Sequence, residues 1–121
     1  MPRFVILRHE LPGHRSRESH WDLMFEKGDL LRTWAVREIP PLGTWIDADL
    51  LPDHRAAYLD YEGPISGDRG TVSRWDDGTF EWLDETESEI EIALSGKHLA
   101  CTARFRHPTA NHGWRFVLNS K

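Results

Sequence analysis

The sequence predicts an all-β fold, a compact barrel of roughly eight strands with one short helix. Runs of alternating apolar and polar residues recur along the 121 residues, and glycine- or aspartate-containing turn signals separate them. Only one segment has helical spacing. Short strands at this spacing are typical of a barrel or sandwich. The length suits one core, so residues 1–121 are expected to form a single domain.

The first predicted strands lie in the N-terminal third. Residues 3–9 (RFVILRH) form a β-rich run, and residues 20–36 predict a hairpin that turns at 27–29. Side chains alternate between the two faces of a strand. One face of 20–26 therefore carries Trp21, Leu23 and Phe25, and the other carries His20, Asp22, Met24 and Glu26. This second face is expected to be the polar side of a half-buried strand.

The remaining strands are expected in the second half. Residues 43–50 predict a strand, and residues 70–83 predict a hairpin with Asp77-Gly78 as its type I′ turn. Residues 89–106 predict a further hairpin that turns at Ser95-Gly96. Residues 113–121 predict the closing strand.

Residues 51–60 (LPDHRAAYLD) are the one predicted helix, with Asp53 as its N-cap. In a helix His54 and Tyr58 stand on one face at i, i+4. Such a pair could bind a phosphate or protonate a leaving oxygen. Packing of His54 beside Tyr58 at the barrel rim is the alternative.

The composition limits the classes of function. The net charge of −5 argues against broad wrapping of nucleic acid, but 12 of the 15 basic residues are arginine, which suits bidentate phosphate contacts. The single Cys101 excludes an internal disulfide framework. No apolar run approaches a membrane span, and no membrane partner is expected. We therefore expect a cytoplasmic protein.

A metal site is one interpretation of the alternation at 20–26. His20 and Asp22 lie about 7 Å apart on one strand face, so both reach one ion. His9 is the candidate third ligand, with His14 as the alternative. Two histidines and a carboxylate suit manganese, iron or zinc. Simple polar surface is the competing explanation.

The order of several segments resembles a known family. The segments are FVILRH, HWDLMFE, LRTWAV, DHRAAYLDYEG, GTVSRWDDGTFEW and GWRFVL. Together they resemble the 3′-phosphoesterase domain of bacterial DNA ligase D and its small stand-alone relatives. The resemblance covers nearly the whole chain and implies a compact β-barrel with a cleft. It also implies a DNA-repair hydrolase, usually manganese-dependent, that removes 3′-phosphates and 3′-terminal ribonucleotides from a primer strand.

The resemblance carries roles to individual residues. The family's metal ligands fall on His9, His20 and Asp22. Its histidine and tyrosine at the phosphate fall on His54 and Tyr58. Manganese is the expected ion, with zinc or iron as alternatives. The expected partners are nucleic-acid 3′ ends, on DNA or an RNA–DNA primer, and a ligase or polymerase.

The chain departs from the family pattern at three points. An arginine that precedes the Asp-His pair in the family has no counterpart in residues 44–52, and the loop between the first two histidines is longer than is usual in the family. The third departure concerns the metal-binding strand. The family has an arginine two residues after the metal-binding aspartate, where this chain has Met24. Loss of a charged contact to the phosphoryl group predicts weaker activity. Arg37, Arg55 and Arg69 are the candidates to bind phosphate instead, because their segments flank the predicted pocket.

Two other functions fit the same residues. A non-catalytic module would keep the metal ligands and bind nucleic-acid ends or a repair partner. A cupin-like Fe(II) enzyme also uses a His-x-Asp pair and a distant histidine, although its third ligand lies downstream, whereas His9 lies upstream.

Overall fold

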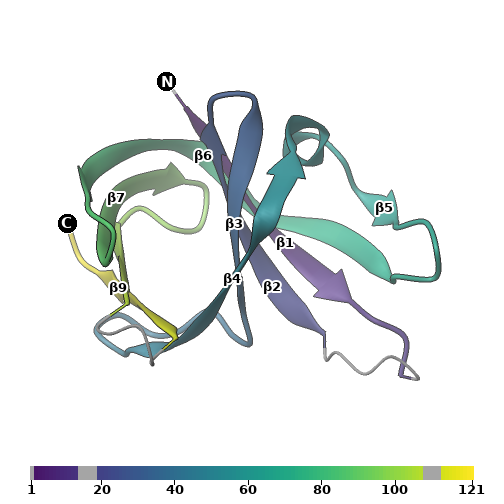
Figure 1. The fold of residues 1–121 in the computed structure, drawn as a ribbon, viewed down its shortest axis with the longest axis horizontal. Coiled ribbons are helices and arrows are strands. Elements are labelled where there is room, and N and C mark those ends of the chain that lie inside the picture. The colour runs from purple at the N-terminus through teal and green to yellow at the C-terminus, as the bar shows by residue number, and fades with distance from the viewer. Residues whose placement is uncertain (1, 14–18, 108–112) are drawn as a thin grey trace.

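The protein is a closed antiparallel β-barrel, shown by a computed structural model that describes residues 2–13, 19–107 and 113–121. The strands follow the order β1-β2-β3-β4-β9-β8-β7-β6, and pairing of β6 with β1 closes the barrel (Figure 1). Within the described residues the elements are β1 (Arg3–Glu10), β2 (His20–Lys27), β3 (Leu30–Val36), β4 (Ile46–Arg55), η1 (Ala56–Leu59), β5 (Gly63–Pro64), β6 (Thr71–Glu85), β7 (Glu89–Gly96), β8 (Thr102–Arg106) and β9 (Trp114–Asn119). The predicted eight-stranded all-β barrel is confirmed.

Aromatic side chains fill the interior of the barrel. Every barrel strand contributes alternate residues to this core, among them Phe25, Trp34 and Phe105, which are at most 1% exposed. The rings of Trp34 and Phe105 stack with centroids 4.0 Å apart, and Phe25 meets Phe105 edge-on at 5.9 Å. Such burial of large rings is the main stabilising contribution in a domain of this size.

A second, smaller apolar cluster lies on the outer side of the barrel wall. Its buried members come from β1, β2, β3, β6 and η1, and they are Val5, Leu7, Met24, Leu31, Leu59 and Val72. In Figure 1 the segment with η1 and β5 lies on the opposite side of the β1–β2–β3 wall from β7 and β9. Both faces of β2 are therefore covered. The prediction that this face of β2 is a polar, solvent-exposed face is wrong, because Met24 is 1% exposed, Asp22 3% and His20 5%.

The predicted hairpin at 70–83 is also wrong, because β6 runs without a turn from Thr71 to Glu85. A type I′ turn needs positive φ at both central residues, and neither Asp77 nor Gly78 has it. Gly78 instead pairs with Phe4 on one side and Gly96 on the other. A Cβ on Gly78 would lie 2.1 Å from the Ser95 carbonyl oxygen, so this glycine serves close approach of strands rather than a turn.

The helix predicted at 51–60 is largely replaced by strand. Residues up to Arg55 belong to β4, and only Ala56–Leu59 form a 3₁₀ turn, with Arg55 rather than Asp53 at the N-cap position. This turn is the one helical element among the described residues, and it is much too short to cross a membrane. The tertiary pairing of β4 with β3 overrides the local helical pattern.

Candidate metal centre and phosphate site

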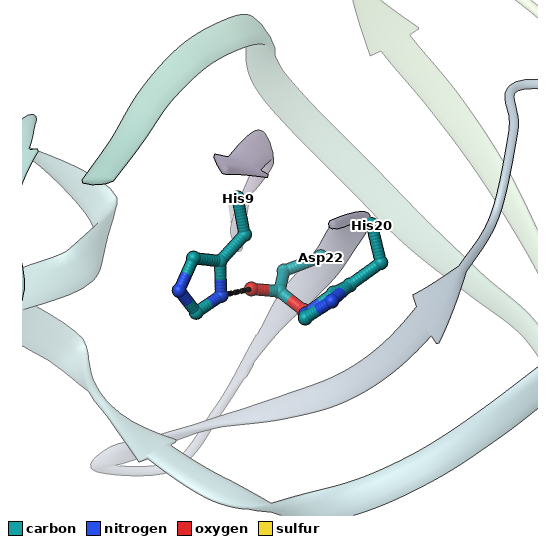
Figure 2. Close-up of side chains that lie close together, drawn as sticks. All are labelled: His9, His20 and Asp22. Atoms are coloured by element: carbon teal, nitrogen blue, oxygen red, sulfur yellow. Dashed lines mark ion pairs between the residues drawn. The ribbon is translucent and has the colours of Figure 1, made fainter. Parts of the chain in front are cut away.

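The ends of β1 and β2 bring His9, His20 and Asp22 together. His9, the second-last residue of β1, lies directly opposite His20, the first residue of β2, and Asp22 follows two residues later on the same face. One ligand atom from each residue lies within 4.8 Å of the others. Figure 2 shows the three side chains turned toward one another. His14, the alternative to His9, lies outside the described residues.

The Asp22 carboxylate lies between the two imidazole rings. Its Oδ2 is 3.3 Å from Nδ1 of His9, and its Oδ1 is 3.0 Å from Nε2 of His20. Oδ1 is buried, yet among the described residues it accepts no hydrogen bond of acceptable geometry. A buried carboxylate oxygen without a donor is costly unless a cation compensates it. This donor set therefore fits a divalent ion.

The two histidines also change the ionisation of Asp22. Burial alone would raise the pKa of this carboxyl, but the contacts with His20 and His9 outweigh burial and lower the pKa from 3.8 to about 2. Asp22 is thus a carboxylate at neutral pH, as a metal ligand must be.

A backbone carbonyl fixes the ring of His9. Nε2 of His9 lies 2.7 Å from the Arg69 carbonyl oxygen. A carbonyl oxygen only accepts hydrogen bonds, so Nε2–H of His9 is the donor. In the neutral ring Nδ1 then carries no proton and is an acceptor. It faces Oδ2 of Asp22, which is also an acceptor. Two acceptors 3.3 Å apart repel unless a proton or a cation lies with them. The contact thus leaves Nδ1 available as a ligand atom.

Gly70 allows the loop with Arg69 to reach β1. Its φ is +86°, and a Cβ there would lie 1.9 Å from the Glu10 carbonyl oxygen. The Gly70 carbonyl accepts a hydrogen bond from the amide of Ile65 at 2.8 Å. No other residue type fits this backbone without displacement. The loop between β5 and β6 is therefore held against the residue that follows His9.

A β-bulge places His54 on the outer side of the barrel. Thr33 pairs with Leu51 and Leu31 with His54, so β4 carries one extra residue between these pairs. Without it Asp53 would take the position opposite Leu31, and His54 would face the interior. His54 thus lies on the same outer side as Leu31, Met24 and Asp22.

His54 and Tyr58 come together although the helix predicted for them is absent. Their ring centroids are 5.6 Å apart across the end of β4 and the η1 turn. Nδ1–H of His54 donates to the Pro52 carbonyl at 2.9 Å, which leaves Nε2 for a ligand. The predicted pair is therefore formed through a bulge and a 3₁₀ turn.

Two hollows meet at Tyr58 and two arginines. The larger hollow, about 400 Å³, is lined by His54, Tyr58, Arg55, Arg69 and Asp53, among others. The smaller hollow, about 320 Å³, shares Tyr58, Arg55 and Arg69 with it. Arg69 connects the hollows with the cluster, because its carbonyl contacts His9. Arg37, the third candidate for phosphate binding, lines neither hollow; it follows β3, whose last residue Val36 pairs with Trp21 beside His20.

Sequence reasoning missed the contribution of the loop 65–70. Ile65, Ser66 and the Arg69 carbonyl all lie at the site, while the sequence shows only glycines that permit close approach. It also missed Asp76, a buried carboxylate that accepts hydrogen bonds from the amides of 97, 98 and 99 and so shapes the loop after β7. No periodic signal marks either feature.

The fold and the site define a class: a small closed β-barrel with two histidines and a buried carboxylate converging on its outer wall, next to an arginine-lined hollow. The DNA ligase D 3′-phosphoesterase domain family matches residues 12–106, and the chain belongs to this family. His20, Asp22, His54 and Tyr58 lie within the matched region, and His9 precedes it. Membership supports a role in processing nucleic-acid ends.

Relatives of the chain are much longer proteins. It is 30% identical over 105 residues to the multifunctional non-homologous end joining protein LigD of Pseudomonas aeruginosa, covering 78% of this chain and 12% of that protein. It is 36% identical over 96 residues to the LigD protein of Mycobacterium bovis, covering 72% of this chain and 13% of that protein. A LigD protein of Mycobacterium tuberculosis matches to the same extent. The chain thus spans about an eighth of these relatives.

Proposed function

We propose that this protein is a metal-dependent 3′-phosphoesterase that removes a 3′-phosphate or a 3′-terminal ribonucleotide from nucleic-acid ends. One observation carries the proposal: Nδ1 of His9 and Oδ2 of Asp22 face each other at 3.3 Å, where only a proton or a cation relieves their repulsion, and Oδ1 of Asp22 is buried without a hydrogen bond of acceptable geometry among the described residues. This geometry favours a cation. Family membership supports the substrate class.

His9, His20 and Asp22 would hold the ion through Nδ1, Nε2 and the carboxylate. Manganese is the proposed ion, with zinc or iron as alternatives, because imidazole and carboxylate ligands suit all three. When bound, such an ion neutralises negative charge on phosphoryl oxygens. Asp22 contributes its full charge at neutral pH, because its pKa is about 2.

His54 and Tyr58 would act on the phosphoryl group itself. The Pro52 carbonyl orients the His54 ring, so its Nε2 can donate a proton to the leaving oxygen when the ring is cationic. The Tyr58 hydroxyl would donate to a non-bridging phosphoryl oxygen. Arg55 and Arg69 border the same hollow and would bind the phosphate charge of the strand that leads to this group.

The test is an end-processing assay on a primer–template with a 3′-phosphate and on one with a 3′-terminal ribonucleotide. We expect release of phosphate or nucleoside with Mn²⁺ and none with EDTA. His20→Ala should abolish turnover, while the control His107→Ala, in the segment after β8, should retain it. Unchanged turnover in His20→Ala would contradict the metal mechanism.

A non-catalytic end-binding module is the second candidate, and the position of Met24 favours it. Met24 is 1% exposed within the outer apolar cluster, so the position where the family has an arginine supplies no positively charged side chain. Absence of turnover with every divalent ion, together with retained binding of 3′ ends, would establish this candidate instead.

A further inference from the structure

The smaller hollow has an aromatic and aliphatic part, Tyr61 and Ile65, that the proposed chemistry does not use. Tyr58, Tyr61 and Ile65 give it aromatic and aliphatic walls, and Arg55, Arg69 and Ser66 give it polar groups. None of its lining residues is an aspartate or glutamate, whereas Asp53 lines the larger hollow. Its volume of about 320 Å³ lies within the range of small-molecule sites.

The two arginines of this hollow differ from most others in the protein. Carboxylates neutralise most of the described arginines, in the pairs Arg3–Asp60, Arg8–Glu10, Arg32–Glu85, Arg74–Glu62, Arg104–Glu91, Arg106–Glu89 and Arg115–Asp47. Within the part of the chain that the structure describes, neither Arg55 nor Arg69 forms an ion pair with a carboxylate. In a chain with a net charge of −5, the hollow is thus a local site of positive charge that fits an anion.

Arg69 is held in place before any ligand binds. Its Nε–H donates to the Ser66 carbonyl at 2.7 Å, and a terminal N–H donates to the Ser66 hydroxyl at 3.2 Å. A guanidinium has five N–H groups, so further donors are available for an anion. The carbonyl of the same residue contacts His9, so Arg69 joins this hollow to the candidate metal site.

The aromatic part of the lining suits a flat ring. Tyr61 is 38% exposed and meets Tyr58 edge-on, with ring centroids 6.1 Å apart. The Tyr61 hydroxyl donates a hydrogen bond to the Pro64 carbonyl. This contact orients the Tyr61 ring before any ligand binds. Stacking of a base on such a ring stabilises binding independently of sequence.

We propose that the smaller hollow binds the nucleotide on the 5′ side of the phosphate that the enzyme attacks, with its base on Tyr61 and Ile65 and its 5′-phosphate on Arg55 and Arg69. The inference rests on the proposed function, because the attacked phosphate defines which side of the strand is the 5′ side. The reaction releases the group on the 3′ side and retains the strand on the 5′ side. A binding site for the substrate therefore has to hold the nucleotide on the 5′ side. Tyr58 borders both hollows, which lets one strand occupy them together.

The first test measures binding without metal, in EDTA, so that catalysis plays no part. Deoxyadenosine 5′-monophosphate is titrated into protein with a ¹³C-labelled Ile65 δ1-methyl group, next to separate titrations with deoxyadenosine and with inorganic phosphate. We expect the nucleotide to bind at least about tenfold more tightly than either part, with a nuclear Overhauser effect between adenine protons and the Ile65 methyl. Equal affinity for phosphate alone, or no such effect, would overturn the proposal.

The second test uses matched arginine variants. Arg55→Ala should weaken nucleotide binding by about tenfold or more, because one charged hydrogen bond to phosphate is lost. Arg106→Ala, on β8, should leave it unchanged, and thermal melting confirms that both variants fold. If nucleotide affinity falls equally in both variants, the smaller hollow is not a specific nucleotide site and the proposal fails.

An activity assay separates this inference from the proposed function. If the wild type shows no turnover but binds the nucleotide as described, only the phosphoesterase proposal fails. If it turns over 3′-phosphate primers yet binds no nucleotide in EDTA, the hollow has another role and this inference fails. We expect KM for a 3′-phosphorylated dinucleotide to rise about tenfold or more in Arg55→Ala relative to Arg106→Ala.

Discussion

Asp22 is the residue on which the proposed metal site depends most, because its two oxygens contact different histidines. Oδ2 faces His9 at 3.3 Å and Oδ1 faces His20 at 3.0 Å. Its side chain is only 4% exposed, so water cannot replace these contacts. Asparagine at this position would keep the shape and lose the charge that both histidines and a cation require.

Asp22 should make the metal-free protein sensitive to acid. Its pKa is lowered from 3.8 to about 2 in the folded state, so the ionised form favours folding. This contribution, about 2 kcal/mol, is complete above about pH 5 and is lost as the pH falls through 4 toward 2.

The measurement is denaturant unfolding of the wild type and Asp22→Asn in EDTA between pH 2 and 6. The difference in free energy of unfolding should shrink as the pH falls below 4. A difference that stays constant over this range would show that Asp22 gains nothing from its contacts with the histidines.

At the scale of elements, the sequence predicted the strands that alternate clearly and missed those that tertiary pairing decides. The hairpin of β2 and β3 and the closing strand β9 were predicted, because alternation and turn residues are local signals. The continuous β6 was not, because Asp77-Gly78 has a turn composition and its role depends on two neighbouring strands.

The candidate site shows the same division. Spacing on one strand was enough to pair His20 with Asp22, and His9 came from the order of strands and the family resemblance. The bulge that turns His54 outward and the loop that carries Arg69 to His9 depend on backbone geometry far along the chain. Those features have no local periodicity, so the sequence could not predict them.

The loop between β5 and β6 gives a prediction at this scale. Gly70→Ala would place a Cβ 1.9 Å from the Glu10 carbonyl oxygen at a φ of +86°. We expect a loss of more than about 1 kcal/mol in stability. Manganese affinity should fall about tenfold or more, because the Arg69 carbonyl no longer orients His9.

Calorimetric titration of Mn²⁺ into the folded variant is the measurement. Gly113→Ala is the control, because a Cβ there meets nothing within 4 Å. Unchanged metal affinity in Gly70→Ala would show that the contact from Arg69 does not orient the metal ligand.

The whole molecule combines an acidic surface with a small cationic hollow. Its net charge is −5, and most described arginines are paired with carboxylates on the barrel. The barrel is closed by β1 and β6, so ladder hydrogen bonding is continuous around it. A protein of this kind should hold a strand end at a few points rather than wrap it.

The salt dependence of binding tests that expectation. Contacts to phosphate by Arg55 and Arg69 alone give a slope of about −1.4 for log K against log salt on single-stranded DNA. Fluorescence anisotropy with a short 3′-phosphorylated oligonucleotide in EDTA measures it. A slope of about −4 or steeper would indicate a broad cationic surface that this structure does not contain among its described residues.

The most direct test of the central claim is the position of Mn²⁺ in a crystal of this protein, from anomalous scattering. We expect one strong anomalous peak from an Mn²⁺ ion that is bound by Nδ1 of His9, Nε2 of His20 and the Asp22 carboxylate. Its anomalous signal should vanish in His20→Ala. A peak elsewhere on the barrel, or an ion whose ligands exclude His9 and Asp22, would contradict the account.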